Sequence, residues 1–211
     1  MTEIKRRLLS VLLTLMISLS TSKAGSSKCY TPETIDYSLR GEFCDQPIFS
    51  VVVPKTEEFI LLDNICYTYF PLPDDPSTFT LYEARVYCDG SFTVTTNVAT
   101  EIGIGQSIIA NPYGTVRDYI IGYAGCDTYL VYRCFVFGAE EPDYIAGFSP
   151  KCQPIGLSCL RKVKEIISER GLPEVDYYIL PNKLPNRCVT QQLCIQPPNP
   201  FYNNLHSVAK L

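Results

Sequence analysis

Histidine, the side chain most often used for acid–base catalysis and metal binding, occurs once in the 211 residues, at His206. A Ser-His-Asp or Cys-His arrangement needs a histidine that packing holds in place, and His206 lies in a proline-containing C-terminal segment. The acidic pairs Asp74-Asp75 and Glu140-Glu141 lie among turn-forming residues, where a solvated surface is the expected role. The sequence therefore predicts that the protein is not an enzyme and uses no cofactor.

Cysteine is the other reactive residue type, and the chain has ten of them. No Cys-x-x-Cys pair is present, so the spacing does not fit a metal site. An even number of cysteines is typical of disulfides in an oxidising compartment. Spacing alone leaves the connectivity open, although Cys152 and Cys159 are close enough in sequence to close a small local loop.

The N-terminal segment has the features of a secretory signal. Lys5, Arg6 and Arg7 precede the apolar run 8–19, and the small residues Ser22 and Ala24 flank the expected cleavage site. We expect residues 1–24 to be removed, because the apolar run is shorter than the roughly 20 residues that cross a membrane. The mature chain would carry a net charge of −7, since the signal takes away four basic residues and one acidic residue. We expect no transmembrane segment and, without a basic stripe, no nucleic-acid partner.

The elements that position any site are mostly strands. Short runs rich in Val, Ile, Thr, Tyr and Phe recur, separated by turn residues, at 48–53, 65–70, 79–88, 91–100, 107–111, 117–124, 128–137 and 143–148. Residues 157–170 show helical spacing, followed by Gly171 as a stop, and residues 175–180 form a short extended run. This order predicts an antiparallel barrel or sandwich with one helix, followed by a flexible tail at 196–211.

The segment 118–134, DYIIGYAGCDTYLVYRC, resembles the paired strands of apolipoprotein-D-like lipocalins. DYIAGFSP, the helix at 157–170 and Cys188 continue in that family's order, and SVVVPKTEEFILLDNICYTYF resembles its first strand, opening loop and second strand. The resemblance covers about residues 29–188. The chain departs from the family in lacking the Gly-x-Trp motif, because it has no Trp, and the arginine expected after the eighth strand falls at Pro150 or Lys151.

The resemblance implies an all-β fold, an eight-stranded antiparallel up-and-down β-barrel of the lipocalin (calycin) type with one C-terminal α-helix packed outside, over residues 25–195. It also implies the disulfides Cys29–Cys134 and Cys66–Cys188. The loss of Trp and Arg weakens the closure of one barrel end. The extra cysteines are expected to replace that closure covalently; they are Cys44, Cys88, Cys126, Cys152, Cys159 and Cys194.

The chain has 15 Tyr and 10 Phe, which either fill the core of a sandwich or line the cavity of a barrel. In a barrel of this family the expected ligand-binding residues are Tyr67, Tyr69, Tyr119, Ile121, Tyr123, Leu130, Tyr132, Tyr144 and Phe148. This assignment depends on strand parity, since a slip of one residue turns each side chain outward. The resemblance implies a secreted carrier of a small hydrophobic ligand such as a fatty acid, sterol, retinoid, carotenoid or bilin. The alternative is a filled barrel that binds another protein through its loops or tail.

Overall fold

The computed structural model describes residues 29–39, 46–112, 114–137 and 142–189. The expected signal at 1–24 and the tail at 196–211 therefore lie outside the described residues, as do Cys44, Cys194 and His206. Within the described part, no helix is long and apolar enough to cross a membrane.

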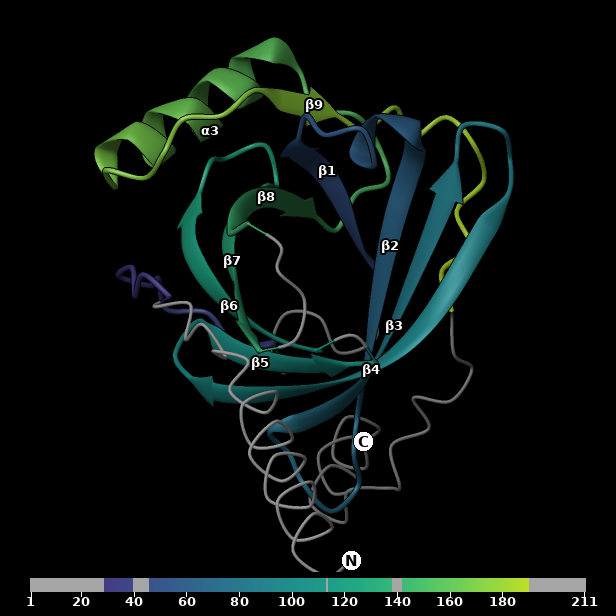
Figure 1. The fold of residues 1–211 in the computed structure, drawn as a ribbon, viewed down its shortest axis with the longest axis vertical. Helices are drawn as coiled ribbons and strands as arrows, with labels where there is room; N and C mark the ends of the chain where they lie inside the picture. Colours follow the sequence, from purple (N-terminus) through teal and green to yellow (C-terminus); the bar gives the residue numbers. More distant parts are fainter. Residues whose placement is uncertain (1–28, 40–45, 113, 138–141, 190–211) are drawn as a thin grey trace, which may run out of the picture.

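The chain forms a closed antiparallel barrel of eight strands (Figure 1). The strands are β1 (Ile48–Pro54), β2 (Leu62–Pro71), β3 (Thr78–Tyr87), β4 (Phe92–Gly103), β5 (Gln106–Asn111), β6 (Gly114–Tyr123), β7 (Tyr129–Phe137) and β8 (Tyr144–Ser149). Each pairs with the next, and β1 closes the sheet by pairing with both β2 and β8. A 3-10 turn, η1 (Phe59–Leu61), precedes β2. Closure leaves the eight strands without the open edges that promote aggregation, and it confirms the predicted barrel.

A helix and a ninth strand lie outside this barrel. Helix α3 (Leu157–Glu169) buries Cys159, Val163 and Ile167 against the outer wall. It ends at Glu169, and Gly171, whose φ of +63° suits glycine, follows as the stop that the sequence predicted. Strand β9 (Tyr177–Ile179) then pairs antiparallel with the end of β1. The expected helix and short strand are thus both present, and they cover the same side of the barrel (Figure 1).

The N-terminal segment 29–39 closes one end of the barrel. The backbone N–H of Ile35 donates to the Ile120 carbonyl at 2.9 Å, and the N–H of Gly105 donates to the Tyr37 carbonyl at 2.9 Å. Gly105 has a φ of +62°, and a Cβ there would lie 2.7 Å from the Ile35 carbonyl oxygen. Only glycine lets the β4–β5 turn approach this closely. The buried Tyr37 side chain packs edge-on against Tyr129, so this end is closed although the chain has no Trp.

Candidate functional site

A large cavity lies at the opposite end of the barrel, the end where β1, β3, β5 and β7 finish. Its volume is about 1310 Å³, larger than the roughly 300–1,000 Å³ of most small-molecule sites. The walls come from the inner faces of β3 and β4, from the loop 55–59, and from residues 171–177 after helix α3. The apolar part of the lining includes Phe59, Tyr87 and Tyr144, with Phe59 and Tyr144 in edge-to-face contact at 5.7 Å.

The closed half of the barrel is filled. A cluster of buried apolar side chains occupies it, including Tyr67, Phe79 and Leu81. The inner cavity that remains among them measures about 30 Å³, a small fraction of the volume of the outer cavity. Of these two cavities, the outer one is the one large enough for an organic ligand.

A buried ion pair lies between the two cavities. Arg133 on β7 donates from Nε to Oδ1 and from Nη2 to Oδ2 of Asp118 on β6, both at 2.7 Å. Arg133 also donates to the Tyr144 hydroxyl at 3.2 Å. Asp118 lines the inner cavity and Tyr144 the outer one, so the pair forms the floor of the large cavity. Burial lowers the pKa of Arg133, but the attraction of Asp118 more than offsets it and leaves that pKa above its ordinary value.

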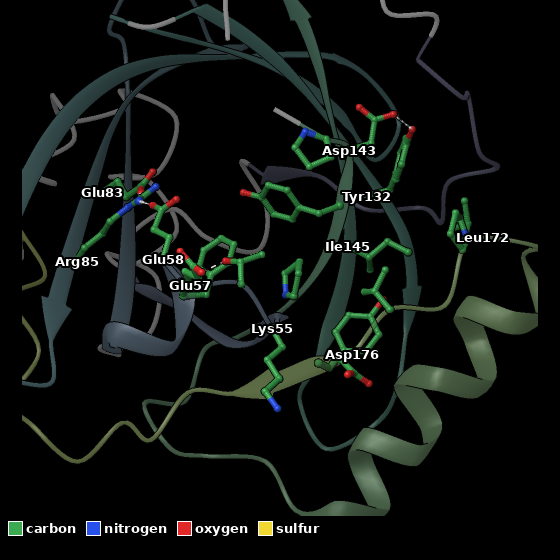
Figure 2. A pocket seen from close by; sticks show the side chains of 18 of the residues that line it. Lys55, Glu57, Glu58, Glu83, Arg85, Tyr132, Asp143, Ile145, Leu172 and Asp176 are labelled. Atoms are coloured by element: carbon green, nitrogen blue, oxygen red, sulfur yellow. Dashed lines mark hydrogen bonds and ion pairs between the residues drawn. The ribbon is translucent and has the colours of Figure 1, made fainter. Parts of the chain in front are cut away.

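A second charged group lies higher on the cavity wall, on β3 and the loop that precedes η1. Arg85 pairs with Glu83 at 2.5 Å and also with Glu58 (Figure 2). Burial lowers the pKa of Arg85, but the attraction of Glu83 more than offsets it, so Arg85 stays charged. Arg85 thus faces two carboxylates, and the group of three keeps an excess negative charge.

The rim beside helix α3 is also polar. The hydroxyl of Tyr132 donates to the Asp143 carboxylate at 2.6 Å, on the side of the cavity away from Glu83 (Figure 2). Burial raises the pKa of the Tyr132 hydroxyl, with the Asp143 bond as a further cause, so the bond persists at neutral pH. The described residues hold no cluster of three or more His, Cys, Asp or Glu side chains suited to a metal ion.

The structure separates the predicted ligand-binding residues into three groups. Tyr144 and Tyr132 line the outer cavity, whereas Tyr67, Tyr69 and Phe148 line the small inner one. Four further residues line neither cavity; they are Tyr119, Ile121, Tyr123 and Leu130.

The parity predicted for β6 and β7 needs correction. Tyr119, Ile121, Leu130 and Tyr132 belong to the layer beneath helix α3, and Tyr123 is 47% exposed. Ile120 and Val131, their neighbours in sequence, point into the barrel instead. The reason is that α3 covers the outer faces of β6 and β7, so apolar residues occur on both faces of these strands. Gly122 permits this packing, because a Cβ there would lie 2.9 Å from Cγ2 of Ile166.

Two of the observed disulfides are those that the resemblance implies, and the third differs from the local Cys152–Cys159 loop expected from spacing. Cys29 pairs with Cys134, and Cys66 pairs with Cys188. Cys159 pairs with Cys126 and not with Cys152, so the predicted local loop is wrong. Cys126 lies in the β6–β7 turn, and the folded chain places this turn beside the start of α3. Cys152 and Cys88 have no disulfide partner among the described residues.

Sequence reasoning missed the polar residues of the barrel interior. Glu83, Arg85 and Asn97 line the outer cavity, and Asp118 with Arg133 forms its floor. Their only signal in the sequence was a charged or amide side chain in the middle of a strand, at the same parity as apolar neighbours such as Phe79 and Leu81. That signal becomes readable only once the inward parity of each strand is known.

The buried tyrosines should make the free energy of unfolding fall at alkaline pH. Burial raises the pKa of Tyr67, Tyr69 and Tyr144 above the ordinary value. A tyrosine whose pKa is higher in the folded state than in the unfolded state adds to the free energy of unfolding. This contribution is full below the unfolded-state pKa of about 10 and is lost as the pH rises above it. We expect Tyr67→Phe to reduce the alkaline slope of the free energy of unfolding by about 1.4 kcal/mol per pH unit.

Urea unfolding at a series of alkaline pH values measures this slope. The matched control is Phe79→Leu, which removes apolar area but no titratable group and should lower stability equally at every pH. If Tyr67→Phe leaves the slope unchanged, Tyr67 does not contribute to it.

Comparison with solved structures identifies the fold. The chain is similar to the siderocalin Ex-FABP, described as functioning through dual ligand specificities, with a TM-score of 0.51, 8% identity, and coverage of 67% of this chain and 96% of the other. It is likewise similar to lobster apocrustacyanin A1, with a TM-score of 0.51, 9% identity, and coverage of 74% and 93%. Comparison with models of protein families and with curated protein sequences finds no match. The closed eight-stranded barrel, the external helix and these similarities show that the chain has the lipocalin fold.

Proposed function

We propose that this protein is a secreted, non-enzymatic carrier that binds a small molecule with a hydrophobic body in the outer cavity of the barrel. The observation that carries this proposal is the cavity of about 1310 Å³ at the open end, with aromatic walls and a closed floor. Burial of apolar ligand surface there would favour binding by roughly 25 cal/mol per Å². The apolar bodies of fatty acids, sterols, retinoids, carotenoids and bilins fit a cavity of this size, and the polar groups of its lining decide which head group the ligand carries.

Secretion is supported by the signal-like segment and by the three disulfides, which persist in oxidising compartments. The pairs Cys29–Cys134 and Cys66–Cys188 are those that the resemblance to apolipoprotein-D-like lipocalins implies, and we propose membership of that subfamily on this basis. Ex-FABP, a protein of the same fold, is described as having ligand specificities, which supports a ligand-binding role.

The first test is native mass spectrometry of the purified, oxidised full chain, followed by titration with the neutral dye Nile red. We expect a co-purifying small molecule or stoichiometric dye binding. Thr95→Trp, which fills the cavity from β4, should weaken dye binding about tenfold. Thr96→Trp is the matched control, because Thr96 is exposed on the other face of the same strand.

Two results would count against the carrier. A bare polypeptide that binds no dye would reject ligand binding altogether. Dye binding that Thr95→Trp leaves intact would place the site elsewhere.

A protein-binding role is the second candidate, and a feature of β4 favours it. The outer face of this strand exposes Phe92, Val94, Val98 and Ile102, and Ile104 follows in the next turn. Exposed apolar patches of this kind mark interaction surfaces in soluble proteins. The filled inner half of the barrel is consistent with this role. A chain that binds no small probe in the preceding experiment would leave this role as the better explanation.

A further inference from the structure

The outer cavity carries more negative charge than positive charge. Its lining contains five carboxylates, from Glu57, Glu58, Glu83, Asp143 and Asp176, and two cationic side chains, from Lys55 and Arg85. Arg85 is already shared between Glu58 and Glu83. The floor adds no charge, since Arg133 and Asp118 neutralise each other. An apolar cavity with this charge balance favours a cation over an anion.

The deepest of these carboxylates is in a position to bind a ligand. Glu83 is 8% exposed, and Arg85 Nε donates to its Oε1 atom, which leaves Oε2 to accept from a ligand. A ligand that places its own carboxylate at this position would meet Glu83 and Glu58 at close range. A contact between like charges in a buried site is unfavourable. The charged group of a fatty acid is therefore a poor match for this part of the wall.

An orphaned acceptor lies beside Glu83, and it is independent evidence. Asn97 on β4 is 6% exposed and lines the cavity, and its side-chain oxygen Oδ1 has no hydrogen-bond partner in the described structure. In the β3–β4 register, Glu83 pairs with Thr95, so Asn97 is the next inward residue along β4. A buried acceptor without a partner costs about 1–3 kcal/mol, which a ligand donor would relieve.

Resting on the proposed carrier function, we infer that the ligand is an amphipathic organic amine. Its ammonium group donates to the Glu83 carboxylate and to Asn97 Oδ1, and its apolar body lies against Phe59, Tyr87 and Tyr144. A single group with more than one N–H can satisfy both acceptors at once, and a primary ammonium has three. One ammonium group thus answers both the charge excess and the orphaned acceptor.

Three indole compounds that differ in one group test this inference: tryptamine (cationic), tryptophol (neutral) and indole-3-acetate (anionic). The protein has no Trp, so indole fluorescence reports the probe alone. We expect tryptamine to bind at least tenfold more tightly than tryptophol, and indole-3-acetate to bind most weakly. Rising ionic strength should reduce the preference for tryptamine, because it screens the charge contribution.

Two variants test whether Glu83 and Asn97 cause the preference for tryptamine over tryptophol. Glu83→Gln should weaken tryptamine about tenfold, to the level of tryptophol. Asn97→Leu should weaken tryptamine about three- to fivefold while raising the melting temperature, because it removes an unpaired buried acceptor. That combination distinguishes a ligand-binding residue from a merely structural one. Glu169→Gln, on the exposed face of helix α3, is the carboxylate control and should leave all three affinities unchanged.

The outcomes separate the two proposals. If tryptophol or Nile red binds but tryptamine shows no preference, or if indole-3-acetate binds as tightly, the amine inference is wrong and the carrier stands. If Glu83→Gln folds with wild-type circular dichroism yet keeps the preference, the assigned residues are wrong. If no probe binds, both proposals fail together.

Discussion

Asp118→Asn is expected to destabilise the folded protein by about 3–5 kcal/mol, the largest effect of any single conservative substitution considered. Arg133 is 8% exposed and makes two bonds of 2.7 Å to the Asp118 carboxylate. Asparagine has nearly the same shape but no charge, so it would leave a buried guanidinium without a counter-charge. Urea unfolding followed by far-ultraviolet circular dichroism measures the change.

A double variant tests whether the destabilisation comes from leaving Arg133 charged and unpaired. Asp118→Leu with Arg133→Met replaces both charges by apolar side chains, and we expect it to be less destabilising than Asp118→Asn alone. A loss of less than 1 kcal/mol in Asp118→Asn would contradict the pair's role, since it would mean that water reaches Arg133. Because this pair is the floor of the cavity, ligand affinity should fall in the single variant as well.

Removal of the Cys66–Cys188 disulfide is the second large effect. Its sequence separation is 122, and that of Cys126–Cys159 is 33. In the chain-entropy account, closing the longer loop contributes about 5 kcal/mol and closing the shorter one about 3.7 kcal/mol. We therefore expect Cys66→Ala/Cys188→Ala to destabilise the protein more than Cys126→Ala/Cys159→Ala, with both losses above 2 kcal/mol.

Equilibrium unfolding of the two double variants under oxidising conditions gives this comparison. Alanine at both positions avoids a stray thiol that could re-pair. Peptide mapping of the wild-type protein should recover a Cys126–Cys159 crosslink. Recovery of a Cys152–Cys159 crosslink instead, or losses in the opposite order, would contradict the assignment.

The sequence by itself determined the order of the elements and the position of each to within about three residues. Turn residues separate β-rich runs, so all eight barrel strands fall where those runs predict. Helix α3 follows from apolar spacing, and its stop follows from Gly171, because glycine tolerates a positive φ without strain. These are local properties, and local sequence records them. The pairs Cys29–Cys134 and Cys66–Cys188 came from the family resemblance.

Tertiary structure alone decided which faces of β6 and β7 line the barrel. Helix α3 buries their outer faces, so apolar residues occupy both parities and the alternation of period two disappears. The charged lining of the cavity also depends on contacts that the sequence does not record. Asp118 meets Arg133 only once β6 pairs with β7, and Arg85 meets Glu58 only once the loop before η1 packs beside β3. The Cys126–Cys159 bond likewise depends on where α3 docks, because cysteines far apart in sequence pair according to the distance between their folded backbones.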